Sequence, residues 1–312
     1  MSGEVRELRE VATWSDSADV VVVGLGAAGA AVALEASGTG AETLVLERAA
    51  AGGGTSAMSG GVLYLGGGTA LQKACGFEDS CEAMYAYLMA SCGESPDEAK
   101  VRLYCEGSCE HYAWLVAQGV PFKPVFYDGC SGEPPTDDGL VWSGSERAHP
   151  FCELARPAPR GHVPQLEHQA GPMLMRALLA AVAASSARVA AGQRCTALVR
   201  DDSGGVVGVI ASGERAIRAR RGVVLTTGGF IQRRDARGPP TPFDAMQVPG
   251  GRRGGRRQWD PLGDGGRGGH RPHERRLDLP ARDAALGPPA RDSGELPGTT
   301  VRERGCLLRM LG

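Results

Sequence analysis

The segment DVVVVGLGAAGAAVALEA, residues 19–36, constrains the fold more than any other part of the chain. Val20 to Val23 are consecutive β-branched residues, a composition typical of a strand buried on both faces of a parallel sheet. The small residues from Ala27 to Glu35 favour a helix. Between them stand three glycines in G-x-G-x-x-G spacing: Gly24, Gly26 and Gly29. The pattern predicts a strand, a tight turn and a helix, and hence an α/β fold around a Rossmann-like unit.

Each of these glycines has a separate role in such a unit. The first permits the turn, the second lets the backbone approach a pyrophosphate, and the third lets the helix sit close to the strand. The N–H groups at the helix start, which include those of Ala27 and Ala28, then face the anion. The next strand, Thr43 to Leu46, ends in Glu47, where a ribose-binding carboxylate is expected. We therefore predict a dinucleotide site; the alternative is a βαβ unit whose glycines only permit close packing.

Both NAD and FAD bind to such a unit, and the stretch AGGGTSAMSGGVLYLGGG, residues 51–68, separates them. Its first half is a flexible, hydroxyl-bearing loop that can wrap the second half of a long cofactor. The pattern E-R-x(3)-G-G-G-T-S-x-x-S-G-G begins at Glu47 and Arg48. It resembles the second FAD contact of the flavoproteins that include fumarate reductase, the succinate dehydrogenase flavoprotein subunit and the 3-oxosteroid 1-dehydrogenases. An NAD-dependent dehydrogenase is the weaker hypothesis, because it does not explain Gly52 to Gly61.

The resemblance also implies which residues would lie along the cofactor. One set follows the FAD itself: Gly53, Gly54, Thr55 and Ser56. A second set lies near the isoalloxazine ring: Ser59, Gly60 and Gly61. A third segment, RARRGVVLTTGGF (residues 218–230), predicts a strand from Val223 to Thr226. In the family a similar strand ends in residues that pass close to the FAD, here Thr227, Gly228 and Gly229. Ahead of it, residues 196–200 and 206–211 predict a hairpin, which corresponds to the small sheet beside the adenine.

The three motifs follow the family's order over about residues 19–231. They imply a Rossmann-like FAD-binding domain of the glutathione-reductase-like type with a small β subdomain. By resemblance, the intact relative is an FAD-dependent oxidoreductase that moves a hydride between flavin and a C–C bond next to a carbonyl or carboxylate. The cofactor carries the redox step in such enzymes. A small-molecule substrate of the enone, steroid or dicarboxylate-like kind is implied, and the sequence identifies no catalytic residue.

The segment between the motifs predicts two helices. The first begins at Ser95-Pro96-Asp97-Glu98, with Ser95 as N-cap and acids on the positive end, and runs to about Gln118. The second is amphipathic and covers the stretch GPMLMRALLAAVAASSARV. Just before it stands Arg160-Gly161-His162. Related enzymes carry His and Arg near this place, facing substrate or flavin, so His162 is either such a residue or an exposed loop histidine. His168 has a weaker claim.

Charge and cysteine content place few further limits on the protein. The formal net charge of −2 implies no special partner. Apolar runs are too short for a membrane span, and the first nineteen residues mix acids and bases, unlike a signal peptide. The nine cysteines are scattered and form no metal-like cluster with histidine. We expect a cytoplasmic protein with no metal and no membrane contact; its oligomeric state is left open.

Composition changes abruptly at Gln232. From there to Gly312 the chain holds sixteen arginines, no lysine and ten of the twenty prolines. It shows neither strand-length alternation nor clear amphipathic periodicity. Three explanations compete: an RGG-like nucleic-acid arm, a disordered linker, or the right gene read in the wrong frame.

Back-translation favours the third explanation, a gene read in the wrong frame. Read one nucleotide later, the codons for Arg256 to Gly263 permit D-G-S-G-I-R-L, similar to a Gly-Asp-Gly-x-x-Ile-like turn of the family. Those for Thr300 to Arg304 permit R-F-V-N-E, similar to an N-x-x-G-x-R-F-x-N-E stretch of its cap region. We therefore predict a frameshift near Gln232, with the cap domain missing or out of frame.

The predicted domains are an N-terminal extension (1–18), an FAD-binding domain (19–231) and an anomalous tail (232–312). A chain of this kind would bind FAD weakly and turn over little. Two alternatives stay open. One is a non-catalytic FAD-binding remnant. The other is a flavin-binding module with a basic nucleic-acid-binding tail, although nucleic acid is the less expected partner.

Overall fold

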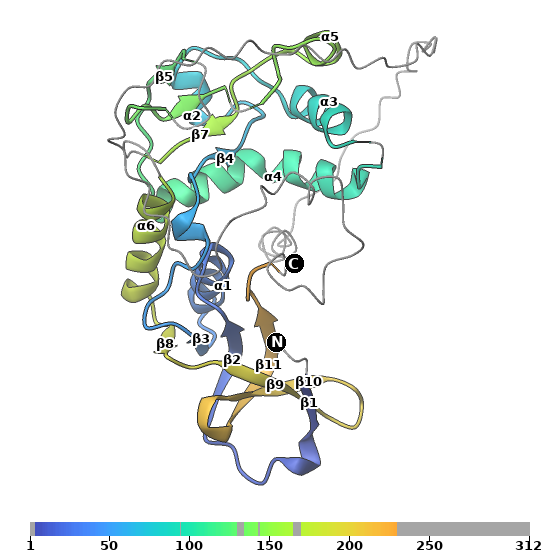
Figure 1. Ribbon diagram of the computed structural model, residues 1–312, viewed down its shortest axis with the longest axis vertical. Coiled ribbons are helices and arrows are strands. Elements are labelled where there is room, and N and C mark those ends of the chain that lie inside the picture. The colour runs from blue at the N-terminus through green and yellow to red at the C-terminus, as the bar shows by residue number, and fades with distance from the viewer. Residues whose placement is uncertain (1–3, 94, 130–133, 143, 165–169, 230–312) are drawn as a thin grey trace, which may run out of the picture. The chain divides into compact units, whose positions relative to one another are not determined.

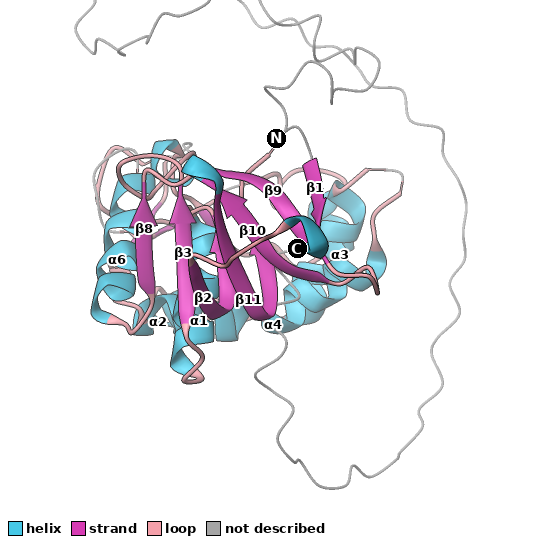
Figure 2. Ribbon diagram, turned by 90° about the horizontal axis from the view of Figure 1, so that it is seen from below, coloured by secondary structure: helices cyan, strands magenta, loops and turns pink. Residues whose placement is uncertain are grey.

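A seven-stranded sheet carries the glycine motif in the computed structural model, which describes residues 4–93, 95–129, 134–142, 144–164 and 170–229 (Figure 1). Its strands are β1 (Glu4–Glu7), β2 (Asp16–Val23), β3 (Thr43–Glu47), β8 (Arg188–Ala191), β9 (Cys195–Arg200), β10 (Val206–Ala211) and β11 (Arg215–Leu225). The spatial order is β1-β9-β10-β11-β2-β3-β8, which can be followed across Figure 2. Strands β11, β2, β3 and β8 are parallel neighbours, whereas β9, β10 and β11 form an antiparallel meander.

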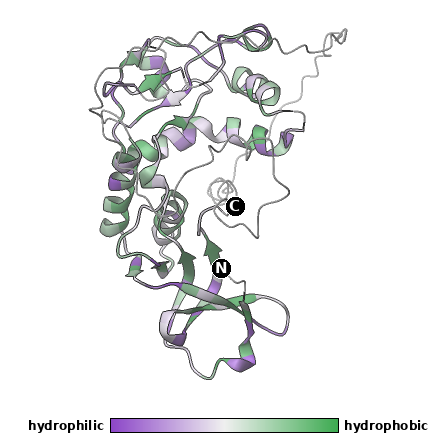
Figure 3. Ribbon diagram, viewed as in Figure 1, coloured by the Kyte–Doolittle hydropathy of each residue, from purple (hydrophilic) through white to green (hydrophobic). Residues whose placement is uncertain are grey.

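The valine run of β2 is buried on both faces because successive side chains alternate sides. Val22 packs into a cluster with residues of helices α1 (Ala27–Gly38), α4 (Glu98–Ala117) and α6 (Gly171–Ala184). Val21 and Val23 pack on the other face, against Val209 and Ile217 of the meander. Figure 3 shows the result as a mostly hydrophobic β2 and α6 beside an α4 of mixed character. The sheet therefore holds the end of β2, where the glycines begin, in a fixed place.

A smaller sheet follows the second glycine segment. Its strands are β4 (Leu63–Tyr64), β5 (Phe126–Tyr127), β6 (Leu140–Val141) and β7 (Gly161–His162), in the order β4-β7-β6-β5. The short helices α2 (Ala70–Ala74), α3 (Cys81–Ser91) and α5 (Phe151–Leu154) complete this part. Three 3₁₀ turns stand at η1 (Leu8–Glu10), η2 (Ser56–Met58) and η3 (Ser212–Glu214). Strand β4 follows Gly61 closely, so this sheet is joined directly to the loop predicted to approach the flavin ring.

Most predicted elements are confirmed, with four differences. The predicted helix over residues 171–189 ends at Ala184, and Arg188 begins strand β8. The strand predicted from Val223 to Thr226 begins at Arg215 and ends at Leu225.

Strand β2 begins at Asp16 rather than Val20, and β1 pairs with β9, so residues 4–7 and 16–18 belong to the sheet instead of standing outside it. The cause is backbone pairing with β11, which a search for apolar residues does not detect. Helix α4 is capped by Asp97, whose carboxylate accepts the N–H of Lys100 at 3.2 Å, rather than by Ser95.

The described ranges contain no helix of the length and apolar character needed to cross a membrane. The predicted frameshift, the arginine-rich tail and His168 lie outside the described residues.

Candidate functional site

The turn after β2 requires glycine at two positions. Gly24 has φ +105°, and a Cβ there would lie 2.5 Å from the carbonyl oxygen of Thr226. A Cβ on Gly29 would lie 2.1 Å from the carbonyl oxygen of Gly24. Both obstacles are backbone atoms tied into the sheet, so neither can move aside cheaply. These two glycines therefore set the close approach of α1 to β2 and β11, as their spacing predicts.

The start of α1 leaves backbone donors without acceptors. The N–H of Ala27 donates to Ser56 Oγ at 3.2 Å. The N–H groups of Gly26, Ala28 and Gly29 have no hydrogen-bond acceptor among the described residues. The first N–H groups of a helix lack intrahelical partners and lie at the positive end of its dipole. Three such donors in one turn are suited to an anion.

Glu47 ties this turn to the end of β3. Its side chain is buried, Oε2 accepts the N–H of Leu25 at 2.8 Å, and Oε1 accepts the N–H of Ala49 at 2.8 Å. Spacing predicted only a ribose contact and missed this structural role. Each carboxylate oxygen has a second lone pair, so the two roles are compatible. Arg48 is exposed and has no ion-pair partner within the described ranges.

The loop of residues 52–56 packs directly onto the turn. The N–H of Gly53 donates to the carbonyl of Leu25 at 2.7 Å, and a Cβ on Gly52 would lie 2.7 Å from Leu25 Cγ. Gly53 and Gly54 both have positive φ, at +117° and +50°. This path brings the Ser56 hydroxyl to the start of α1 and leaves Gly54 with free space around its Cβ position.

The segment predicted to lie near the flavin ring, residues 59–61, packs against the start of α6. The carbonyl of Gly60 accepts the N–H of Ala170 at 3.1 Å. A Cβ on Gly61 would lie 2.2 Å from the Gly171 nitrogen, and one on Gly171 would lie 2.3 Å from the carbonyl oxygen of Ser59. Residues 59–61 therefore adopt a path fixed by α6.

The end of β11 meets the same turn. The Thr226 hydroxyl lies 3.0 Å from the carbonyl oxygens of both Val23 and Gly24, and its N–H donates to Val23 at 2.9 Å. Sequence reasoning missed Thr226 as part of the turn, although it is the first threonine of T-T-G-G. The three predicted residues after it are exposed, and a Cβ on either glycine would meet nothing within 4 Å: Thr227, Gly228 and Gly229.

A second cluster of functional groups lies beside the smaller sheet. Arg160 and Asp79 form a bidentate ion pair, with Nε–Oδ2 2.9 Å and Nη2–Oδ1 2.7 Å, and both side chains are fully buried. Asp79 also accepts the N–H of Gly67 and the side-chain amide of Gln72. Burial by itself would raise the pKa of Asp79, but the hydrogen bonds and charge of Arg160 hold it below its ordinary value.

His162 belongs to this cluster, which corrects both roles considered for it from sequence. It is fully buried, with Nδ1 3.1 Å from the carbonyl oxygen of Arg160 and Nε2 2.8 Å from the Thr69 hydroxyl. A carbonyl only accepts, so Nδ1 carries the proton and Nε2 accepts from Thr69. Burial lowers the pKa of His162 to about 4. The imidazole is thus neutral, and both of its ring nitrogens are hydrogen-bonded inside the protein. It is neither an exposed loop residue nor one that faces a substrate.

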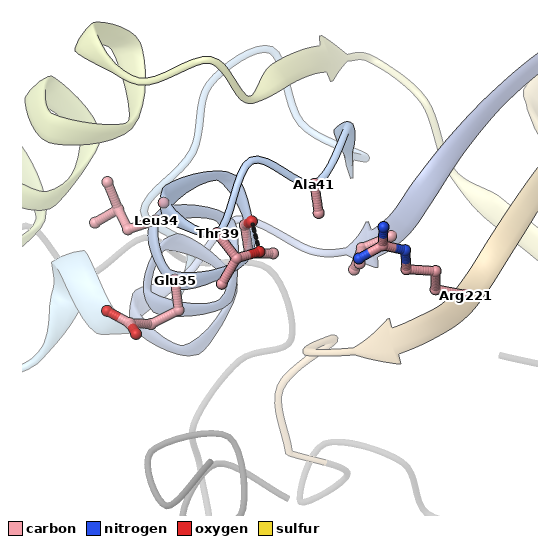
Figure 4. A pocket seen from close by; sticks show the side chains of 8 residues that line it. Leu34, Glu35, Thr39, Ala41 and Arg221 are labelled. Atoms are coloured by element: carbon pink, nitrogen blue, oxygen red, sulfur yellow. Dashed lines mark hydrogen bonds between the residues drawn. The ribbon is translucent and has the colours of Figure 1, made fainter. Parts of the chain in front are cut away.

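One pocket of about 260 Å³ lies at the other end of α1 (Figure 4). It is lined by Val20, Leu34, Glu35, Ala36, Gly38, Thr39, Ala41 and Arg221. An α-helix rises about 1.5 Å per residue, which puts this pocket roughly 15–18 Å from the glycine turn. We do not assign the cofactor to it, because the free backbone donors and the loop of residues 52–56 gather at the opposite end.

The predicted residues thus fall into a connected arrangement. Gly24 to Gly29, Glu47 and the loop of residues 52–56 meet through direct hydrogen bonds, and the end of β11 joins them through Thr226. Such a strand–turn–helix unit with free N–H groups and an acid at the end of the next strand defines a dinucleotide-binding α/β protein.

The chain belongs to the FAD binding domain family, whose model matches residues 19–255. It is 38% identical over 200 residues to a 3-oxo-5-alpha-steroid 4-dehydrogenase of Comamonas testosteroni, in a match that covers 63% of this chain and 37% of that protein. The resemblance inferred from the motifs is therefore confirmed at the level of the family, and the cofactor of the family is FAD.

Solved structures give the same fold. The 3-ketosteroid-delta4-(5alpha)-dehydrogenase of Rhodococcus jostii RHA1, in complex with 4-androstene-3,17-dione, is 51% identical with a TM-score of 0.70; the match covers 73% of this chain and 49% of that one. A flavocytochrome c3 fumarate reductase is 29% identical with a TM-score of 0.58, over 70% of this chain and 35% of that one. The chain thus spans between a third and a half of the length of these proteins.

The described residues fit FAD on physical grounds. The free N–H groups of Gly26, Ala28 and Gly29 suit the pyrophosphate, which carries the negative charge of the cofactor. The positions of Gly54, Gly228 and Gly229 leave open space, as a long ligand running past the loop requires.

Proposed function

We propose that this protein is an FAD-dependent oxidoreductase that moves a hydride between flavin and a C–C bond next to a carbonyl or carboxylate. The observation that carries FAD binding is the set of three N–H groups at the start of α1 that find no acceptor within the described ranges, next to the loop of residues 52–56. Support for the reaction class comes from the similar proteins, which are named as a steroid dehydrogenase and a fumarate reductase.

We assign the cofactor contacts as follows. The N–H groups of Gly26, Ala28 and Gly29 bind the pyrophosphate. The Ser56 hydroxyl accepts the N–H of Ala27 and so orients the loop. Glu47 accepts from a ribose hydroxyl through its remaining lone pairs. The other contacts lie along the cofactor or near its ring: Gly24, Arg48, Gly53, Gly54, Thr55, Ser59, Gly60, Gly61, Thr227, Gly228 and Gly229. When bound, the flavin supplies the hydride chemistry; the protein supplies position and electrostatics.

A 3-oxosteroid is the first substrate to test. The support is the 51% identity to a dehydrogenase solved with 4-androstene-3,17-dione. Because this chain matches only part of that protein, the reaction is best measured by its effect on bound flavin. The flavin is reduced anaerobically, and its reoxidation is followed with a 3-oxosteroid enone and, in parallel, with fumarate. Reoxidation by the steroid alone supports the steroid assignment; reoxidation by fumarate alone contradicts it.

FAD binding is tested most sharply at Gly26. Its backbone is extended, at φ −87° and ψ −164°, which any residue adopts, and a Cβ there would first meet Ser56 Oγ at 3.3 Å. Gly26→Ala should therefore leave the fold intact but intrude where the pyrophosphate approaches. We expect FAD affinity to fall at least tenfold, measured by titration of flavin fluorescence.

Gly38→Ala is the matched control, because Gly38 ends the same helix and a Cβ there meets nothing within 4 Å. It should bind FAD like the unchanged protein. A Gly26→Ala variant that binds FAD equally well would contradict the assignment of the pyrophosphate to this turn.

We also propose an FAD-binding domain of residues 19–231, to whose sheet the extension 1–18 contributes β1 and the start of β2, a separate tail of residues 232–312, and the frameshift near Gln232. The proposal rests on the change of composition and on the family-like segments of the shifted frame. The test is to sequence the gene and transcript across the codons for Thr226 to Gly238, and then to compare the chain as written with a frame-restored one. We expect repeated turnover only from the restored chain, which is therefore also the chain for the flavin reoxidation test described above. An intact single frame with no family match in the shifted reading would contradict the frameshift.

A further inference from the structure

Met58 is the most exposed large apolar side chain among the described residues, at 78% of its surface. The next, Leu154, is 58% exposed. Single apolar residues are common on protein surfaces, so exposure alone identifies nothing. The place of Met58 is more informative. It ends η2, between Ser56, which contacts the start of α1, and the segment of residues 59–61.

The direction of the Met58 side chain is set by its two neighbours in η2. A 3₁₀ turn has three residues per turn, so successive side chains point about 120° apart. Ser56 Oγ accepts the N–H of Ala27 at 3.2 Å and so faces α1. Ala57 packs against the main hydrophobic cluster of the core. Met58 takes the third direction, away from both α1 and the core.

The turn that carries Met58 is held in place from several sides. The N–H of Met58 donates to the carbonyl of Thr55 at 3.1 Å, and the Ser59 hydroxyl donates to the carbonyl of Ser56 at 2.8 Å. A Cβ on Gly171 would lie 2.7 Å from that same Ser56 carbonyl oxygen, so the start of α6 backs the turn closely. The thioether of Met58 therefore stays on the outer side of the cofactor loop.

The chemistry of FAD decides which part of it Met58 could meet. The pyrophosphate is charged and the ribityl chain carries hydroxyls, whereas the dimethylbenzene edge of the isoalloxazine ring is apolar. A thioether has no charge and no hydrogen-bond donor, and it makes favourable contacts with the edges of aromatic rings. Met58 directly precedes residues 59–61, which are assigned to the ring, so the apolar edge is the part that suits it.

We propose that Met58 packs against the apolar edge of the flavin ring and that bound FAD covers it. This inference rests on the proposed function, because it takes the ring to lie beside residues 59–61. Met58→Ala should lower FAD affinity about tenfold, since burial of the side chain from water no longer contributes to binding. Met58→Leu keeps the apolar volume and should bind FAD almost as the unchanged chain does. Leu154→Ala is the matched control, at an exposed apolar position on α5, and should leave FAD affinity unchanged.

Methionine oxidation gives a readout that does not depend on turnover. The full chain, with FAD removed and with FAD added, is treated with dilute hydrogen peroxide in the dark, and the sulfoxide at each methionine is measured by peptide mass spectrometry. Without FAD, Met58 should oxidise faster than Met89, which is half-buried on α3. FAD should slow the oxidation of Met58 about fivefold, because oxidation follows exposure, and leave that of Met89 unchanged.

The results separate this inference from the proposed function. A chain that binds no FAD contradicts the proposed function and this inference together. FAD binding without protection of Met58, or with full affinity in Met58→Ala, overturns this inference alone. If Met58 oxidises no faster than Met89 before FAD is added, another part of the chain covers it, and the inference is again overturned.

Discussion

The glycine turn (residues 24–29) and the buried network (Thr69, Gln72, Asp79, Arg160 and His162) differ in how they use polar groups. The turn offers backbone N–H groups that have no acceptor in the described part of the chain, close to open space. The network consists of side chains that are almost entirely paired with one another, including a fully buried ion pair. Charged residues and shifted pKa values concentrate in the network, yet the features suited to a ligand concentrate in the turn. Perturbed pKa values therefore mark structure here rather than the cofactor site.

Breaking the ion pair should have the largest effect. Asp79→Asn keeps the shape of the side chain but leaves the Arg160 charge buried without a counter-charge. Removing one partner of a buried pair is expected to lower the free energy of unfolding by about 3–5 kcal/mol. Chemical denaturation measures this loss.

The exposed pair of Arg102 and Glu82 provides the contrast, because Glu82→Gln should cost less than about 1 kcal/mol. Removing both charges, in the double variant Asp79→Asn with Arg160→Met, should recover part of the loss. If Asp79→Asn and Glu82→Gln lower the free energy of unfolding equally, the buried ion pair contributes no more than an exposed one, which would contradict this prediction.

The second prediction concerns pH. The folded-state pKa of His162, about 4, lies below its ordinary value of 6.5. The full stability it confers is therefore present above pH 6.5 and declines as pH falls, because the unfolded chain takes up the proton first. Below about pH 4 this contribution levels off. Two and a half pKa units correspond to about 3 kcal/mol between those limits.

His162→Asn should flatten this slope. Burial also lowers the pKa of His111, which adds to the slope in the same direction. Asp79, with its pKa below its ordinary value, stays ionised over this window. A His162→Asn chain with an undiminished slope would show that its imidazole is not held neutral.

The two regions also differ in what sequence can predict. The turn was predictable because each step is local: a β-branched run, glycines at fixed spacing, and an acid at the end of the next strand. What was missed depends on segments distant in sequence. The Thr226 hydroxyl reaches the turn only through parallel pairing of β11 with β2, and β1 is in the sheet only because β9 pairs with it.

The network could not have been predicted by the same reasoning. Asp79 and Arg160 are brought together by the pairing of β4 with β7 and by the loop before α3. Asp79 lies in no motif, and the pattern Arg160-Gly161-His162 gives no sign of the partner of Arg160 or of whether His162 will be buried. His162 was therefore considered for a loop or a substrate-facing role, and tertiary packing excluded both.

The smallest expected effect concerns the Ser56 hydroxyl at the glycine turn. Among the described residues, Ser56 alone supplies a side-chain acceptor to the start of α1, at 3.2 Å from the Ala27 nitrogen. Ser56→Ala removes the acceptor of the Ala27 N–H, which then joins those of Gly26, Ala28 and Gly29 in having none among the described residues. The free energy of unfolding should fall by about 1 kcal/mol, as it does when a helix cap is lost. Ser95→Ala is the matched control, since Ser95 is exposed and its hydroxyl has no hydrogen-bond partner among the described residues. Because the other three donors are unchanged, FAD affinity should fall less than in Gly26→Ala. If Ser56→Ala instead lowers FAD affinity as strongly as Gly26→Ala without altering stability, the hydroxyl belongs to the ligand site rather than to the helix cap.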